Sequence, residues 1–439
     1  MADALLIRDV TLIDGTGAPA LADAAIAIEG GCIVAAGLAD DVDASPGATV
    51  IDGSGLWAVP GLIDTHVHTE LVGFESLPVF LALGLTTVRD LGGGLPFLTE
   101  TRALLEDGAV GPRLLVTGPM IDGEPPTWPA LVKSTPDAEA AVRVVEEHLA
   151  AGADAIKLYT TLQPESLRRC IEQVDGRVPV TGHLGATRAS EAMEAGINGL
   201  EHALLTPYND LVPDELRTAH DETMMSPGFW RKMNQGWLQA DFDSERAQRF
   251  IEMVVERDVS FCPTLTVLPG ANDEPTDEEL RHAPRVAERW LEATSQREAQ
   301  SVERPPEFQQ WLAKVRGKLA DLVGRVHRAG GRIVAGTDTG AVRSLVPGYA
   351  LHLELKLLAA AGLSNMELLR SATARAAEAL RRDDLGTIEA GKRADVLLVR
   401  RDPLLEITAL RDIQRIVQDG RVYDPADLLR QASETPGDS

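Results

Sequence analysis

Two histidines separated by one residue, His66 and His68, end an apolar run that begins at Leu62. In a β-strand, residues two positions apart point to the same side, so both imidazoles are expected to project together. Imidazole is a common protein ligand for zinc and similar metals. The pair therefore predicts half of a metal site, and a strand that carries two histidines by chance is the alternative. Further ligands must come from other parts of the chain.

More residues with metal-binding or reactive side chains come at the ends of short runs of β-forming residues. They are Lys157, His183, His202 and Asp338. The carboxyl ends of the strands in a parallel barrel lie on one rim, so these side chains are expected to meet the two histidines of the first run. The sequence thus predicts a cluster of imidazoles with one lysine and one carboxylate.

Between residues 60 and 379, β-rich apolar runs alternate with helical patterns, which is typical of parallel βαβ units. The expected strands cover residues 58–67, 86–90, 113–117, 155–159, 178–181, 199–201, 259–264 and 332–336. Eight strands with helical crossovers predict an α/β fold of the (β/α)8 TIM barrel type, with catalytic residues at the carboxyl ends of the strands.

The two ends of the chain show a different pattern, with short β-rich runs separated by turn residues. Residues 1–59 and 380–430 are expected to form one small β-sandwich domain, because chain termini often lie close together. Residues 60–379 would form the catalytic barrel. The polar segment 431–439 is predicted to be a disordered tail.

The formal net charge of −25 disfavours binding to nucleic acid or to anionic membranes. The three cysteines show no metal, redox or disulfide spacing, which fits a reducing compartment. The amino-terminal residues lack the pattern of a signal peptide, and no apolar run reaches the roughly 20 residues of a membrane-spanning helix. We expect a cytoplasmic protein that forms a homo-oligomer and acts on a small molecule.

A lysine in this cluster needs an explanation, because an ammonium group has no lone pair for a metal. Nearby cations should favour the neutral form of Lys157. Addition of CO2 to the neutral amine would give a carbamate, an anionic group that can bridge two metals. The alternative is a lysine that is merely packed inside the barrel.

This arrangement resembles the amidohydrolase superfamily, in the binuclear form whose bridging lysine is carboxylated. The resemblance covers nearly the whole chain and includes the segment 385–395 near the carboxyl end. It implies two divalent metal ions, with zinc expected, bridged by N6-carboxylysine at Lys157. The ligands it implies are His66, His68 and Asp338 for the more buried metal, and His183 and His202 for the more exposed one.

The resemblance also implies a mechanism, in which a hydroxide that bridges the metals attacks a carbonyl carbon. Asp338 would take the proton of the nucleophile and pass it to the leaving amine. Tyr159 lies two residues after the lysine and could donate a hydrogen bond to the oxyanion, with simple packing as the alternative.

The spacing of these residues is similar to the imidazolonepropionase-like and Xaa-Pro dipeptidase-like branch, which implies cleavage of an amide or peptide bond. N-acyl amino acids, dipeptides such as Xaa-Pro and ochratoxin-like amides are the implied substrates. A substrate carboxylate would need a cation, for which Arg89 and Arg343 are candidates, with ordinary ion pairs as the alternative. His220 could also reach the pocket. The sequence departs from its relatives at 346–349, where they often carry a His-Gly pair.

The crossovers 205–258 and 268–331 are longer than an average βα unit. The first contains large apolar residues over 224–237, which we interpret as a substrate lid, with an oligomer contact as the alternative. Two other functions stay open. One is hydrolysis of a cyclic amide, amidine or ester, or deamination of a heterocycle, and the other is a scaffold without catalysis.

Overall fold

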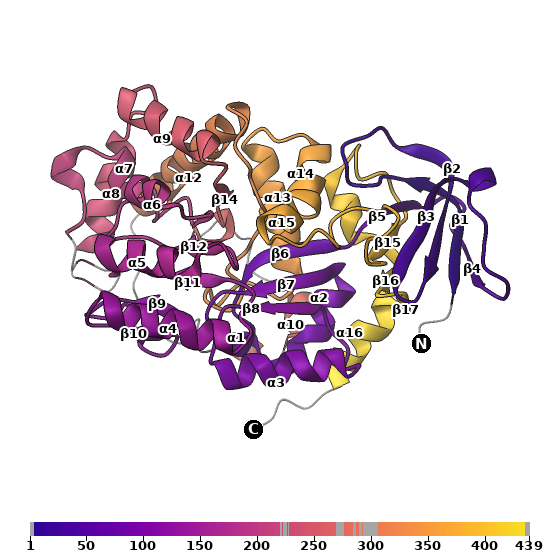
Figure 1. Cartoon of the computed structure of the whole chain (residues 1–439). Coiled ribbons are helices and arrows are strands. Elements are labelled where there is room, and N and C mark those ends of the chain that lie inside the picture. The colour runs from indigo at the N-terminus through magenta and orange to yellow at the C-terminus, as the bar shows by residue number, and fades with distance from the viewer. Residues whose placement is uncertain are drawn as a thin grey trace.

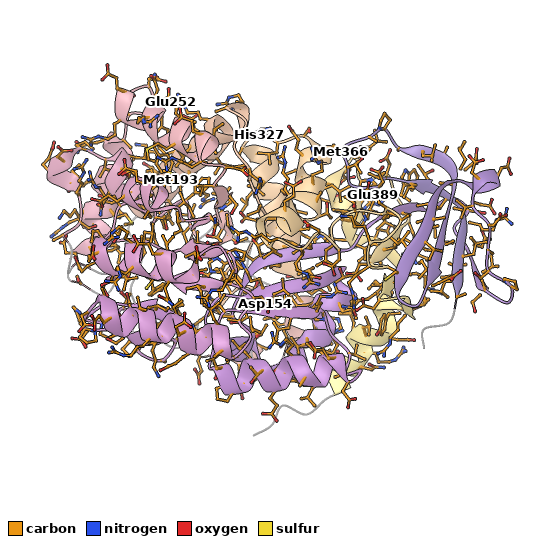
Figure 2. All side chains as sticks on the ribbon, viewed as in Figure 1. Asp154, Met193, Glu252, His327, Met366 and Glu389 are labelled. Carbon is orange, nitrogen blue, oxygen red and sulfur yellow. The ribbon has the colours of Figure 1, made fainter. Side chains whose placement is uncertain are left out.

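The computed structural model describes residues 4–219, 222, 226, 228–268, 276–283, 287–288, 292 and 306–434. Strands from the first and last parts of the chain, drawn in indigo and yellow, form a sheet at one side of the molecule (Figure 1). Helices surround a set of short strands in the rest of the molecule. Side chains fill the space between these elements (Figure 2), and Met193 is buried whereas Glu252 is exposed. None of the described helices is both long and apolar enough to span a membrane.

The terminal segments form one sheet of eight strands. Its strands are β1 (Leu5–Leu12), β2 (Leu21–Glu29), β3 (Cys32–Leu38), β4 (Thr49–Asp52), β5 (Trp57–Pro60), β15 (Val396–Val399), β16 (Ile413–Gln418) and β17 (Arg421–Tyr423). Their order is β17-β16-β15-β5-β1-β2-β3, and β4 pairs with β1. Gly30 and Gly31 adopt positive φ in the tight turn between β2 and β3, which is the backbone that such hairpins need. Both ends of the chain thus contribute strands to this one sheet.

The middle of the chain carries two parallel sheets. The first contains β6 (Leu62–Val67), β7 (Leu85–Asp90) and β8 (Arg113–Val116). The second, in the order β10-β9-β11-β12-β13-β14, contains β9 (Met120–Asp122), β10 (Val132–Ser134), β11 (Ile156–Leu158), β12 (Val180–Gly182), β13 (Gly199–Glu201) and β14 (Ser260–Cys262). The predicted α/β class with parallel strands is confirmed. Strands β9 and β10 were not predicted.

Single contacts join the two parallel sheets at both sides. The backbone N–H of Asp154 donates to the carbonyl of Val116 at 2.7 Å, next to β8 and β11. Phe261 of β14 forms a parallel bridge with Ile333. The N–H of Thr65 in β6 donates to the carbonyl of Ala335 at 3.1 Å. The segment 332–336, predicted as the last strand, thus lies between β14 and β6 but is held by isolated bridges.

The predicted strand 58–67 is divided at Gly61. Its N–H donates to the carbonyl of Asp395 in the terminal sheet at 2.9 Å. A side chain at this position would collide with Thr86, so only glycine fits the crossing. One continuous segment therefore supplies β5 to the terminal sheet and β6 to the parallel sheet.

Helices cover the strands. They are α1 (Thr69–Val72), α2 (Leu77–Ala82), α3 (Leu95–Glu106), α4 (Ala138–Ala150), α5 (Pro164–Val174), α6 (Ala189–Ala195), α7 (Tyr208–Leu211), α8 (Phe229–Gln239), α9 (Glu245–Glu256), α10 (Asp277–Arg281), α12 (Pro306–Arg328), α13 (Tyr349–Ala360), α14 (Asn365–Ser371), α15 (Ala374–Ala379) and α16 (Pro425–Glu434). Apolar residues of α4 and α5 recur at helical spacing and face the strands, which is why these segments fold as surface helices.

The end of the chain differs from the prediction. Helix α16 packs against α2 (Figure 1) and continues to Glu434. Leu428 and Ala432 are buried on its inner side, and this burial extends the helix past residue 431. The expectation of a disordered tail is therefore wrong for residues 431–434, and residues 435–439 lie outside the described part.

Candidate metal centre

All six residues predicted as ligands meet at the bottom of one cavity, and we call this set the cavity floor. It consists of His66, His68, Lys157, His183, His202 and Asp338. Each is at most 8% exposed. The rings of His66 and His202 have centroids 4.7 Å apart, and those of His183 and His202 are 4.4 Å apart. The parallel strands thus carry these side chains to one place, as expected for strand ends.

His66, His68 and Asp338 form the tightest group in the floor. Oδ1 of Asp338 lies 3.3 Å from Nε2 of His66 and 3.1 Å from Nε2 of His68. Burial alone would raise the pKa of Asp338, but the charge and hydrogen bonds of the two histidines outweigh it and hold that pKa well below its usual range. The carboxylate is therefore ionised and ready to bind a cation.

His183 and His202 lie beside that group. Burial lowers the pKa of both imidazoles well below the usual value, so both rings are neutral. Nδ1 of His202 lies 2.8 Å from Oγ1 of Thr264, which leaves Nε2 toward the floor. His202 and Asp338 both have positive φ, at 67° and 64°. This backbone conformation is uncommon for residues other than glycine. At both positions it directs a predicted metal-binding side chain at the strand end toward the cavity.

Lys157 fits the role of a modified lysine. It is 1% exposed, and its Nζ has no hydrogen-bond partner in the part of the chain that the structure describes. Burial lowers the pKa of its amine to about 8, which makes the neutral form more accessible than in a free lysine. A buried ammonium without a partner is costly. The residues present therefore fit a metal centre.

Glu201 supports the cavity floor through hydrogen bonds, and the sequence did not predict this role. Its Oε2 accepts a hydrogen bond from Nδ1 of His66 at 2.8 Å, which directs Nε2 of that ring to the floor. Its other oxygen accepts from Arg89 at 2.8 Å and from the hydroxyl of Thr181 at 2.5 Å. Burial alone would raise the pKa of Glu201, but Lys157, His66 and Arg89 keep it well below the usual value.

Arg89 does not act as a substrate clamp in this geometry. Besides its bond to Glu201, its Nε donates to the carbonyl of Thr65 at 2.7 Å. The guanidinium is buried beneath the floor and does not line the cavity. Arg89 thus forms a structural ion pair where a contact with a substrate carboxylate was predicted, because Glu201 of β13, in the other parallel sheet, reaches it.

Asp64 is a second supporting carboxylate that sequence reasoning missed. It accepts hydrogen bonds from the N–H of His66 at 3.1 Å and from the hydroxyl of Thr337 at 2.8 Å. Burial raises the pKa of Asp64 to about 7. Asp64 therefore fastens β6 to the segment that ends in Asp338. The signal in the sequence was an acidic residue inside an apolar strand, two positions before His66.

The floor opens into a cavity of about 410 Å³. We call its upper part the cavity wall, consisting of Trp128, Leu205, Trp230, Asn234, Trp311 and Leu312. Tyr159 lines the cavity beside the floor, and its ring packs edge-on against His183 with centroids 4.8 Å apart. Trp230 and Asn234 lie on α8, in the segment interpreted as a lid.

Arg343, another predicted substrate contact, is exposed and does not line the cavity, although Val342 does. His220 lies outside the described residues. Trp237 of the same apolar cluster is buried, and its Nε1 donates to the carbonyl of Leu204 at 2.9 Å. That residue belongs to the core beneath α8.

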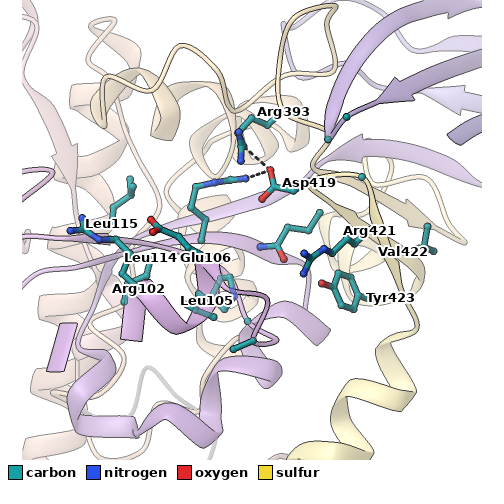
Figure 3. A pocket seen from close by; sticks show the side chains of 18 of the residues that line it. Arg102, Leu105, Glu106, Leu114, Leu115, Arg393, Asp419, Arg421, Val422 and Tyr423 are labelled. Atoms are coloured by element: carbon teal, nitrogen blue, oxygen red, sulfur yellow. Dashed lines mark hydrogen bonds and ion pairs between the residues drawn. The ribbon is translucent and has the colours of Figure 1, made fainter. Parts of the chain in front are cut away.

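A larger hollow of about 940 Å³ lies between the terminal sheet, α3 and β8 (Figure 3). Arg393 and Arg113 both pair with Oδ1 of Asp419, at 2.6 and 2.7 Å. Arg113 also pairs with Asp395 at 2.7 Å. None of the residues of the cavity floor lines this hollow. Its charged groups join the terminal sheet to the strands.

Curated proteins are similar to parts of the chain. N-acyl-D-aspartate deacylase of Alcaligenes xylosoxydans xylosoxydans is 31% identical over 233 residues, which is 46% of this chain and 46% of the relative. Imidazolonepropionase of Idiomarina loihiensis is 42% identical over 67 residues, which is 15% of this chain and 16% of the relative. The match thus spans less than half of each relative.

Solved structures agree on the fold. A Xaa-Pro dipeptidase structure superposes with a TM-score of 0.66 at 18% identity, over 96% of this chain and 100% of that one. The model of the amidohydrolase family matches residues 57–425, which contain the whole cavity floor. The resemblance noted in the sequence is therefore confirmed, and the chain belongs to the amidohydrolase family.

Proposed function

We propose that this protein is a metal-dependent hydrolase that cleaves a C–N bond of an amide or peptide. The observation that carries the proposal is the cavity floor, in which neutral imidazoles, an ionised carboxylate and a buried lysine without a partner converge. Family membership supports the same reaction class. The relatives named above include a deacylase and a dipeptidase, which are consistent with amide substrates.

Two divalent metals, with zinc as the expected ion, would be held by the floor. His66, His68 and Asp338 would hold one, His183 and His202 the other, and carboxylated Lys157 would contact both. When bound, the metals would supply Lewis acidity and lower the pKa of water. We retain zinc because imidazole and carboxylate ligands suit it.

The chain's own groups have separate tasks in this proposal. The carboxylate of Asp338 takes a proton from the attacking water and delivers it to the leaving nitrogen as the C–N bond breaks. Burial raises the pKa of Tyr159, so its hydroxyl stays protonated and can donate to the developing oxyanion. Glu201 acts through His66, whose ring it orients.

The architecture that we propose for this function is a (β/α)8 barrel over residues 60–379. The contacts that link β8 to β11 and the segment 332–336 to both β14 and β6 support a closed ring of strands. Residues 1–59 and 380–430 would form a β-sandwich domain, and the single sheet built from both ends supports this division. Assembly into a homo-oligomer remains part of the proposal.

The test is hydrolysis of a panel of N-acyl amino acids and Xaa-Pro dipeptides by zinc-reconstituted protein, with metal content measured by mass spectrometry. Turnover with about two metals per chain would support the proposal. Two metals without turnover would favour a cyclic amide or an ester as substrate. A chain that binds no metal would contradict the mechanism and favour a scaffold without catalysis.

A further inference from the structure

The cavity wall has a composition that limits what can bind beside the floor. Three tryptophans reach it from separate parts of the fold, namely Trp128 after β9, Trp230 on α8 and Trp311 on α12. Leu205 and Leu312 lie between them. Large aromatic side chains provide most of the contact area for apolar ligands, and they favour rings through stacked or edge-on packing.

The described lining of the cavity offers no cation outside the floor that could pair with a substrate anion. Its one lysine or arginine is Lys157, which lies within the floor. Arg89 is bound to Glu201 underneath, and Arg343 is exposed outside the lining. A free carboxylate placed against the wall would lose water without gaining a partner, which is costly.

One polar side chain of the wall, that of Asn234, indicates which hydrogen-bonding group a ligand would carry. Asn234 lines the cavity, and its Oδ1 is buried with no hydrogen-bond partner within the described ranges of the chain. The backbone carbonyl of the same residue accepts from Nε1 of Trp311 at 3.4 Å, which fixes its position against α12. A buried acceptor without a partner is unfavourable unless a ligand supplies a donor.

We propose that the substrate is a neutral amide with an aromatic or other apolar ring, and that it carries an N–H that donates to Asn234. Trp230 and Asn234 are the residues that determine this specificity. The inference rests on the proposed hydrolase function and departs from a dipeptide or N-acyl amino acid with a free carboxylate. The cavity of about 410 Å³ suits a small molecule of this kind, since ligand sites span about 300–1,000 Å³.

The experiment compares four probes that share a scissile acetamide, assayed by acetate release from the zinc-loaded enzyme. They are N-acetylphenylalanine amide, its methyl ester, the free acid N-acetylphenylalanine, and N-acetylglycine amide. We expect kcat/KM for the aromatic carboxamide to exceed that for the free acid and for the glycine compound by about tenfold or more. Free acid cleaved as well as the carboxamide would overturn the inference, although it would support the hydrolase function.

Variants of Trp230 and Asn234 test whether these two residues determine the substrate preference. Trp230→Ala should lower kcat/KM about tenfold for the phenylalanine amide and leave the glycine amide unchanged. Asn234→Leu should abolish the preference for the carboxamide over the methyl ester, whereas Asn234→Asp keeps an acceptor at that place. Leu238→Ala is the matched control, because Leu238 is an exposed apolar residue of α8 outside the cavity.

Binding separates failure of the inference from failure of the proposed function. If none of the probes is cleaved, the panel of N-acyl amino acids and Xaa-Pro dipeptides decides the hydrolase proposal, and titration calorimetry on the same zinc-loaded protein decides the specificity. A roughly tenfold tighter Kd for the phenylalanine amide than for the glycine amide, lost in Trp230→Ala and kept in Leu238→Ala, supports the inference. Equal affinities for the two amides would overturn it.

Discussion

The floor and the wall of the cavity are built in opposite ways. Floor side chains come from the ends of short parallel strands, and hydrogen bonds to buried partners such as Glu201, Asp64 and Thr264 support this set. Wall side chains come from α8, α12 and the segments after β9 and β13, and most of them contact their neighbours through apolar surface. The difference indicates that reactivity and selectivity reside in separate elements, so each should be changeable without the other.

The largest expected effect is at Lys157, where alanine removes the group that would bind both metals. Metal ions supply several kcal/mol of transition-state stabilisation, so kcat/KM should fall by about 10³-fold or more. Added short-chain carboxylic acids should restore part of the activity by replacing the carbamate. Lys133→Ala, at an exposed lysine of β10, is the control. Wild-type turnover of Lys157→Ala would show that this lysine is no ligand.

A smaller effect is expected from Glu201→Gln, which keeps the volume but removes the charge that orients His66. Groups that orient a metal-binding histidine typically account for about 10–100-fold in metal affinity. Competition with a zinc chelator should show a loss of this size, while the substrate preference set by the wall stays unchanged. Glu252→Gln, at an exposed residue of α9, should change neither quantity. An unaltered zinc affinity in Glu201→Gln would mean that the cavity floor is ordered without the carboxylate of Glu201.

A substitution at Gly236 of α8 should alter the cavity wall without altering the cavity floor. A side chain here would collide with the hydroxyl of Tyr208, so Gly236→Ala should displace the helix and destabilise the fold by about 2 kcal/mol. We expect a lower Tm and a weaker aromatic preference with unchanged metal content. Gly317→Ala on α12 is the matched control, because open space surrounds that position. A loss of metal in Gly236→Ala would show that floor and wall are coupled.

The smallest effect is expected at low pH, where protonation could affect the cavity floor or the stability of the rest of the fold. Burial lowers the pKa of His148 on α4 to about 4, so folding loses stability as the pH falls from about 6.5 toward 4. His148→Leu should avoid this loss, worth about 1 kcal/mol near pH 6 in urea unfolding. The dependence of activity on pH should not change, because the floor is untouched. A shifted activity profile would contradict that separation.

The floor could be predicted from the sequence because its residue types are rare and each stands at the end of a β-rich run. The partners that support it could not, since Glu201 and Arg89 meet only when the two parallel sheets are brought together. Trp230 belonged to a recognised apolar cluster, but Trp128 and Trp311 gave no signal. Their convergence depends on how α12 packs against α8, which no local pattern specifies. Strands β9 and β10 are three residues each and too short for an alternating pattern.

The passage from β5 to β6 through Gly61 has a consequence for biosynthesis. Strand β5 pairs with β1 on one side and with β15 on the other, and Val59 lies opposite Leu397. Translation proceeds at about 5–20 residues per second, so β15 emerges roughly 20–70 s after β5. During that interval an apolar strand edge of the nascent chain has no partner. The terminal sheet is thus completed only after the parallel strands have been made, although it contains β1.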